Sequence, residues 1–308
     1  MRDLRASVKP PRIRRPALDG ATAGRYVGGV PGSSEGLPLD TIICGDALDT
    51  LRRLPAESVH LMITSPPYNL DKPYANHDDD LDYAEYLDWM AEVWAAAKRV
   101  LVRGGRLCIN IGENKRQNIT EPTYSAFIRQ LVELDMLYRG TVIWNKHSAA
   151  KHCAWGSWRS CSNPHIVPRH EYIIIFSRDQ FKLEGDAEKS DLTGDEFMTC
   201  TRSVWEFGPE SRKRVGHPAP FPRTLPERLI KFYSYRENIV LDMFAGSGTV
   251  GLVAAELDRR FVLIDNSPEY CELARQRFEK ERGLFRSLVP DVITLADYLA
   301  EGNAAGGK

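Results

Sequence analysis

Two short segments of the chain combine residue types that could bind a nucleoside-like ligand and react with it. The first is DMFAGSGT, from Asp242 to Thr249, which follows an apolar run and precedes a helical pattern. Gly246 and Gly248 would permit a tight turn, and the free N–H groups at a helix start favour an anionic or carboxylate-bearing group. Roughly twenty residues further on, Asp265 ends the next apolar run, where a carboxylate can accept from both ribose hydroxyls.

This first segment is neither GxGxxG nor a P-loop with its lysine, which disfavours NAD and ATP as the ligand. The pattern therefore indicates a nucleoside-type cofactor of another kind. The alternative is a glycine turn that serves only the packing of the helix against the strand.

The second segment is TSPPYNL, from Thr64 to Leu70, directly after another apolar run. Pro66 and Pro67 stiffen the chain and lack N–H donors, so we expect both carbonyl oxygens to face outward as acceptors. The Ser65 hydroxyl adds a polar atom, and the Tyr68 ring offers a face for stacking. The segment suits a planar ring that bears an amine, although a simple turn at a strand end is an equal alternative.

Alternating strand and helix patterns surround both segments and predict a parallel α/β sheet with helices on both faces. We expect strands at 41–44, 59–64, 106–112, 140–144, 171–176, 238–244 and 260–265. We expect helices from 83 to the glycines at 104–105, near 122–135, over 225–235, from the glycine turn to about 257, and over 268–281. The stretch 147–170 has no periodicity and is predicted to be a loop.

Together the two segments resemble the catalytic loop and the cofactor loop of the S-adenosylmethionine-dependent amino-methyltransferases of DNA. These enzymes methylate an exocyclic nitrogen of cytosine or adenine. Shorter matches over residues 39 to 282 also resemble family motifs: Gly45-Asp46-Ala47, Ile143 to Lys146, Arg169 to Tyr172, Gly216 to Pro222, and Leu225 to Ile230. Because the catalytic loop comes first, the chain resembles the circularly permuted β type.

The resemblance implies a Rossmann-like methyltransferase fold with a mostly parallel sheet and an antiparallel hairpin. It implies a division into a tail (1–37), a catalytic half (38–146), a target-recognition insertion (147–215), a cofactor half (216–285) and a C-terminal extension and tail (286–308). Ser65 resembles the members that act on cytosine N4, while adenine N6 stays open. Met243 replaces a common proline and Asp265 a common glutamate.

The resemblance also implies roles for individual residues. The catalytic residues would be Ser65, Pro66, Pro67 and Tyr68. The residues that hold S-adenosylmethionine would be Asp46, Ala47, Phe221, Asp242, Phe244, Ala245, Gly246, Ser247, Gly248, Thr249, Asp265 and Asn266. Ser65 Oγ and the Pro66 carbonyl would orient the amine of a base flipped out of the helix and stacked on Tyr68. A covalent route through carbon 5 of cytosine is disfavoured, since none of the six cysteines follows a proline.

The charge distribution points to double-stranded DNA as the partner. The formal net charge is only −1, but the segment from Arg139 to Lys182 holds seven bases against two acids. The candidate DNA contacts are Lys146, Lys151, Trp155, Trp158, Arg159 and Arg169. An ordinary solvated surface with packed tryptophans is the alternative. The histidines and cysteines of this region fit no common zinc spacing, so we expect no metal.

Composition excludes several other classes of protein. With 43% hydrophobic and 27% charged residues, the 308-residue chain can form a core, and no apolar run is long enough for a bilayer. The N-terminal residues lack a signal-peptide pattern and the six cysteines form no CxxC pair, which predicts a reduced, cytoplasmic protein.

We therefore expect a site-specific DNA methyltransferase, with a role in restriction–modification or epigenetic marking. A homodimer and a companion endonuclease are left open. Three alternatives are methylation of RNA, methylation of a protein amide, and a non-catalytic DNA-binding module. Ser65 disfavours the protein-amide enzymes, which typically have asparagine there, and intact Ser65, Tyr68, Gly246 and Asp265 disfavour the binding module.

Overall fold

The computed structural model describes residues 36–67, 82–116, 119–146, 157, 159–166, 168–209, 222–281 and 288–305. Five of the predicted site residues lie outside these ranges: Tyr68, Lys151, Trp155, Trp158 and Phe221. The expected N-terminal tail lies outside them as well, apart from its last two residues.

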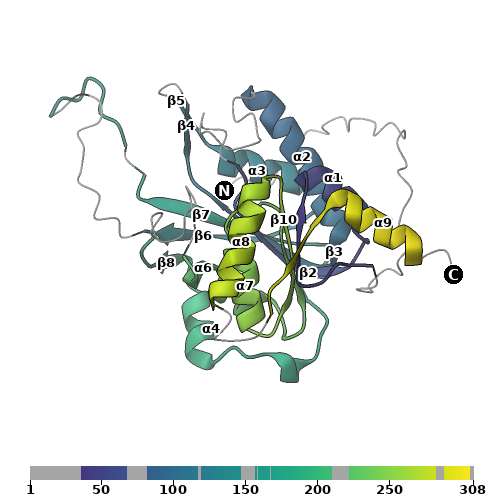
Figure 1. The fold of residues 1–308 in the computed structure, drawn as a ribbon. Helices are drawn as coiled ribbons and strands as arrows, with labels where there is room; N and C mark the ends of the chain where they lie inside the picture. Colours follow the sequence, from purple (N-terminus) through teal and green to yellow (C-terminus); the bar gives the residue numbers. More distant parts are fainter. Residues whose placement is uncertain are drawn as a thin grey trace, which may run out of the picture.

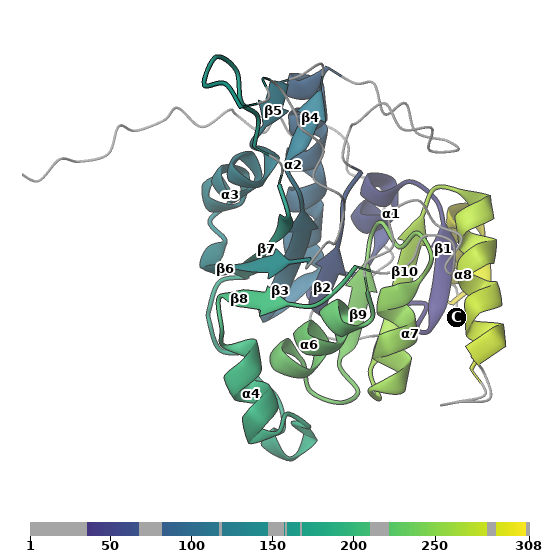
Figure 2. The same cartoon turned by 90° about the vertical axis from the view of Figure 1, so that its left-hand side faces the viewer.

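A sheet of nine strands runs through the molecule in the order β11-β1-β10-β9-β2-β3-β7-β6-β8 (Figures 1 and 2). The six strands from β11 to β3 are mutually parallel, whereas β7 is antiparallel to both β3 and β6. The strands are β1 (Thr41–Cys44), β2 (Val59–Thr64), β3 (Leu101–Ile111), β6 (Leu137–Asn145), β7 (His170–Ser177), β8 (Val204–Glu206), β9 (Ile239–Asp242), β10 (Arg260–Asp265) and β11 (Asp291–Thr294). A separate hairpin pairs β4 (Asn114–Arg116) with β5 (Ile119–Glu121).

Helices cover both faces of the sheet and bury two hydrophobic clusters against it (Figure 2). One face is covered by α1 (Ala47–Arg53), α2 (Tyr83–Val100), α3 (Thr123–Glu133) and α9 (Leu295–Ala305). The other face is covered by α4 (Gly194–Cys200), α6 (Thr224–Tyr233), α7 (Thr249–Glu256) and α8 (Pro268–Glu281). A short 3-10 helix lies at Ala187–Lys189. The expected Rossmann-like methyltransferase architecture, with its antiparallel hairpin, is confirmed.

The long helix α2 shows why these elements form. Tyr86, Met90, Val93, Trp94 and Ala97 recur at three- and four-residue steps and are all fully buried. The Asp82 side chain accepts a hydrogen bond from the Ala84 N–H at 2.9 Å and so caps the first turn. The apolar stripe fixes α2 against the strands that carry the two loops of interest.

The end of α2 differs from the expectation. The helix ends at Val100 rather than at the glycines, and β3 begins at Leu101 and runs through Gly104 and Gly105. Gly104 has a φ of +75°, and a Cβ there would lie 1.9 Å from the Lys182 carbonyl oxygen. The glycine therefore permits close approach of the chain after β7 and does not terminate a helix.

Several elements were not predicted from the sequence. They are α1, α4, β8, the β4–β5 hairpin, β11 and α9. Most are short, and α9 corrects the expected C-terminal tail, since Glu301 to Ala305 are helical. In the part of the chain that the structure describes, no helix is both long and apolar enough to cross a membrane.

Candidate active site

The two predicted loops leave neighbouring strands at one edge of the sheet. Strand β2 pairs in parallel with β9, so Thr64 and Asp242 lie at adjacent carboxyl ends. Thr64 Oγ1 donates to Asp242 Oδ1 at 2.9 Å, and the Phe244 N–H donates to the same oxygen at 3.1 Å. The hydrogen bond between Thr64 and Asp242 joins the beginning of the catalytic loop to the beginning of the cofactor loop.

Asp242 is almost completely buried, with 1% of its surface exposed. Burial raises the pKa of its carboxyl to about 7, although the hydrogen bonds from Phe244 and Thr64 act in the opposite direction. The same carboxyl group therefore holds both loops in place and changes its charge near neutral pH.

The catalytic loop is supported from α2. Ser65 and Pro67 are half-buried and Pro66 is buried. The hydroxyl of Tyr86 donates to the Pro67 carbonyl oxygen at 2.8 Å. The expectation that both proline carbonyls face outward is therefore wrong for Pro67, whose oxygen accepts a hydrogen bond from Tyr86 on α2.

The cofactor loop is held by the residue that was predicted to hold a ribose. The Gly246 N–H donates to Asp265 Oδ2 at 2.7 Å, and the Ser267 N–H donates to Asp265 Oδ1 at 3.0 Å. Burial raises the pKa of the Asp265 carboxyl. Because each carboxylate oxygen can accept more than one hydrogen bond, Asp265 can shape the loop and still accept from a ligand.

A second support of the cofactor loop, Arg277 on α8, was missed by the sequence analysis. Its Nη1 donates to the Ser247 carbonyl at 2.6 Å, to Ser247 Oγ at 2.9 Å and to Thr249 Oγ1 at 3.0 Å. Gly248 has a φ of +74°, and a Cβ there would lie 2.8 Å from the Cβ of Ala274. Ala274 lies against the loop, and Arg277 follows three residues later on the same face of α8, so only the tertiary contact places the arginine behind the loop.

The remaining predicted cofactor residues gather at the same edge. Strand β1 pairs with β10 so that Cys44 lies opposite Asp265, and the Gly45 N–H donates to the Asp265 carbonyl at 2.9 Å. Asp46 is exposed and caps α1 through its bond from the Asp49 N–H, while Ala47 is buried. Asn266 directly follows Asp265, and the ring of Phe244 packs against Trp89 with centroids 5.9 Å apart.

These residues fit S-adenosylmethionine. Helix α7 begins at Thr249, and its N-cap Gly248 offers no side-chain cap, so the first turn can present N–H groups to a carboxylate. The exposed Asp46 and the half-buried Asp265 supply acceptors suited to hydroxyl and amine donors. Among the described residues there is no cluster of three or more side chains that could hold a metal ion.

Among the described residues of the basic segment, several cationic side chains are paired within the protein. Lys146 is ion-paired with Glu171, which also accepts from Asn110 Nδ2 at 2.7 Å. Arg178 Nη2 donates to Glu57 at 2.7 Å, and Lys182 pairs with Glu184 at 3.0 Å. Arg159 is exposed with a φ of +55°, and Arg169 lines a cavity at the ends of β6 and β7. Several of these charges are thus used within the protein.

Comparison with known proteins agrees with this geometry. The model of the N6/N4 DNA methylase family matches residues 59–276. The chain is 30% identical to the Type II methyltransferase M.HpaI of Haemophilus parainfluenzae over 80% of this chain and 76% of that protein. It is 29% identical to the DNA adenine methyltransferase YhdJ of Escherichia coli over 78% of this chain and 82% of that protein.

A solved structure is similar as well. It is TTHA0409 of Thermus thermophilus, described as a putative DNA modification methylase in complex with S-adenosyl-L-methionine. The TM-score is 0.67 at 28% identity, and the match covers 83% of this chain and 98% of that one. The strand order, the paired loops and these matches agree: the chain belongs to the N6/N4 DNA methylase family and is an S-adenosylmethionine-dependent DNA methyltransferase.

Proposed function

We propose that the enzyme methylates N4 of cytosine at specific sites in double-stranded DNA. The observation that carries this proposal is the serine at position 65, which follows Thr64 directly and lies at the carboxyl end of β2 beside the cofactor loop. In the DNA methyltransferases that this loop resembles, serine at this place is typical of enzymes that act on cytosine.

The proposed mechanism depends on positioning by the protein. The lone pair of an aryl amine is delocalised into the ring, which makes the amine a poor nucleophile. Ser65 Oγ and the Pro66 carbonyl would accept its two hydrogens, so that the nitrogen becomes tetrahedral and its lone pair turns toward the cofactor. S-adenosylmethionine supplies an electrophilic methyl group when bound. Tyr68 is proposed to stack on the flipped base.

Support from the fold makes such positioning effective. Thr64 is fixed to the buried Asp242, and Pro67 is fixed to Tyr86 on α2. The polar atoms of Ser65 and Pro66 therefore lie between two anchored residues. A rigid acceptor pair costs little reorganisation at the moment of reaction, which is the condition for a large contribution to the rate.

Adenine N6 is the second candidate acceptor. It is favoured by the similarity to the protein named as a DNA adenine methyltransferase, which extends over 78% of this chain. The two candidates share the same loop and the same direction of methyl transfer, and they differ only in the base that enters the site.

Mass spectrometry of nucleosides separates the candidates. Unmethylated plasmid DNA is incubated with the protein and S-adenosylmethionine, then digested to nucleosides. N4-methylcytosine is the expected product, and N6-methyladenine in its place would establish the second candidate. If neither appears while S-adenosylmethionine still binds, the proposal is rejected in favour of the alternatives that leave DNA unmethylated. The Ser65→Ala variant is the control for contaminating activity.

We also propose that the enzyme acts in the cytoplasm as the modification half of a restriction–modification system. The name of M.HpaI as a Type II methyltransferase supports this role. Plasmid that the enzyme has methylated should then resist a restriction endonuclease of the same specificity. Sedimentation with and without DNA tests for the homodimer that the sequence left open.

A further inference from the structure

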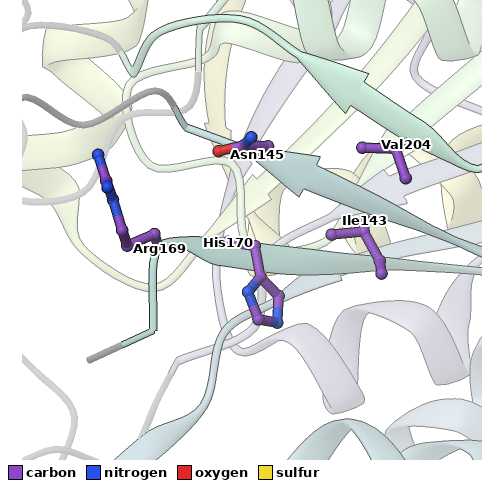
Figure 3. Close-up of a pocket in the computed structure, with 5 residues that line it drawn as sticks. All are labelled: Ile143, Asn145, Arg169, His170 and Val204. Carbon is purple, nitrogen blue, oxygen red and sulfur yellow. The ribbon is translucent and has the colours of Figure 1, made fainter. Parts of the chain in front are cut away.

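A cavity of about 410 Å³ lies at β7, β6 and β8, the last three strands of the sheet (Figure 3). It is lined by Ile143 and Asn145 from β6, Arg169 and His170 at the start of β7, and Val204 from β8. The cavity thus combines two apolar side chains with three that can form hydrogen bonds. None of the described residues of the catalytic and cofactor loops lines it.

Strand register explains why these side chains meet. Asn145 lies opposite His170, and Ile143 lies opposite Val204. Alternate residues point to one face, while Trp144 and Trp205 point to the other face and are buried there with exposures of 2% and 1%. Ile143 and Val204 are 37% and 45% exposed, so two β-branched side chains form an uncovered apolar floor.

The cavity lies next to the part of the sheet that helix α3 covers. On the neighbouring strand, Tyr124 from α3 stacks on Tyr172 with ring centroids 3.9 Å apart. The His170 ring meets Tyr172 edge-on at 5.0 Å, and beyond it the face of β6 and β8 is open. Lys146 and Glu171, which are adjacent in sequence to Asn145 and His170, form an ion pair. Asn110 donates a further hydrogen bond to Glu171.

The cavity opens at the same edge of the sheet as the catalytic loop. Thr64 pairs with Ile109 at the end of β2, Ile111 pairs with Tyr172, and Asn145 with His170. Because adjacent strands lie about 4.8 Å apart, β7 and β6 are roughly 10 to 15 Å from β2. That is the distance of about three to four base-pair steps along B-form DNA.

The polar groups of the cavity match the edges of bases. An arginine guanidinium pairs with guanine O6 and N7, an asparagine amide pairs with adenine, and an apolar floor suits the methyl group of thymine. Asn145 Nδ2 lies 3.4 Å from Glu206 Oε1, which orients the amide. Figure 3 shows the Arg169 and Asn145 side chains on one side of the cavity and Ile143 with Val204 on the other.

We propose that this cavity reads a base pair of the recognition sequence a few steps from the flipped base, with Arg169 specifying a guanine. Asn145 is the second polar contact, and Ile143 with Val204 exclude water from the base edge. The inference rests on the proposed function in one respect, that double-stranded DNA is the substrate.

The test compares methylation of a randomised duplex library by four forms of the protein. The forms are wild type, Arg169→Gln, Asn145→Ala and Arg236→Gln. Arg236 is a matched control, because it precedes β9 at the opposite edge of the sheet and its contact to Asp191 is long, at 3.8 Å. The methylated molecules are sequenced, and kcat/KM is measured on the preferred site and on single-base variants of it.

We expect Arg169→Gln to lower discrimination at one guanine position by about 10- to 100-fold. Asn145→Ala should relax the same or the adjacent position, and Arg236→Gln should leave the preferred site unchanged. Affinity for S-adenosylmethionine should be equal in all four forms.

Two results would overturn the inference. One is a uniform loss of DNA affinity with unchanged site preference, which would make Arg169 a phosphate contact. The other is no change in either variant. A wild-type protein that methylates no DNA would instead reject the proposed function, so the two failures are distinguishable.

Discussion

Two regions along the same side of the sheet differ in structure: the cofactor end, at β9 and β10, and the outer end, at β6 to β8. At the cofactor end, Asp242, Asp265 and Arg277 are each hydrogen-bonded to the loop that they support. At the outer end, the faces of β6 and β8 expose Ile143 and Val204 to solvent. The first end is thus rigidly pre-formed, and the second is an open surface.

This difference follows from what each end must bind. A cofactor has one shape, so a loop held by hydrogen-bonded side chains loses little freedom when the ligand arrives. A DNA site is a sequence of bases, and it is read by side chains at an accessible edge. The contrast therefore predicts large and specific effects at the cofactor end and smaller, sequence-dependent effects at the outer end.

The largest effect is expected for Ser65→Ala. This change removes one acceptor for the reacting amine, so the single-turnover rate should fall by about 100-fold or more. Affinities for S-adenosylmethionine and DNA should stay near those of wild type. Ser190→Ala, at an exposed position toward the opposite edge of the sheet, should keep the full rate. A normal single-turnover rate for Ser65→Ala would show that the serine hydroxyl has no catalytic role.

Asp265→Ala should weaken the binding of S-adenosylmethionine. The change removes a charged acceptor and leaves the N–H groups of Gly246 and Ser267 without their partner. We expect a loss of about 1–3 kcal/mol in calorimetry. Asp291→Ala, which removes an exposed carboxylate from β11, is the control. Equal affinity for both variants would show that the loop holds its shape without Asp265.

Asp242→Asn should change the pH dependence of stability. The carboxyl has a pKa of 3.8 when unfolded and about 7 when folded, so between these values the folded protein holds the extra proton. The contribution of Asp242 to the unfolding free energy is therefore greatest at low pH and falls as the pH rises through 7. Urea unfolding should show the wild type losing at least about 1 kcal/mol relative to Asp242→Asn between pH 5 and 8.

The same comparison with Asp195→Asn, an exposed carboxyl on α4, controls for general charge effects. A difference between wild type and Asp242→Asn that is constant with pH would show that the buried carboxyl does not titrate in this range.

The smallest effect concerns salt. Each phosphate contact contributes a slope of about one to the dependence of log affinity on log salt. Arg159→Gln should make the slope for DNA binding shallower by about one, since its side chain is exposed. Lys146→Gln should change it less, because Glu171 already neutralises the lysine.

Filter binding at several salt concentrations measures both slopes, with Arg236→Gln as the control. A large change for Lys146→Gln would mean that DNA displaces Glu171. The outer end would then be more adaptable than the contrast between the two ends suggests.

Local patterns were sufficient for most of the fold. The strands at Thr41–Cys44, Val59–Thr64 and Arg260–Asp265 and the helix at Pro268–Glu281 have the predicted bounds. The three strands are mostly apolar runs that are buried, and the helix repeats buried residues along one face at Cys271, Ala274 and Phe278. Such signals depend on near neighbours in the chain, so they can be read without knowledge of the rest of the molecule.

Other elements depend on contacts that are distant in the chain. Strand β8 has three residues and forms because β6 offers it an edge, and α4 is a single short helix. Residues 286–308 were expected to be a C-terminal extension and tail, yet Glu301 to Ala305 continue α9, whose Tyr298 is buried in the core. Tertiary packing decides such short elements, since their own propensity is weak.

The candidate site divides in the same way. The residue types of Ser65, Asp242 and Asp265 indicated their chemistry, because tight turns, acceptors and strand ends are local features. The partners of these residues were decided by the strand order, which places Thr64 beside Asp242, Tyr86 against Pro67 and Arg277 behind Ser247. The sequence determined which groups are present, and the tertiary structure decided which of them meet, because burial and pairing are properties of residues far apart in the chain.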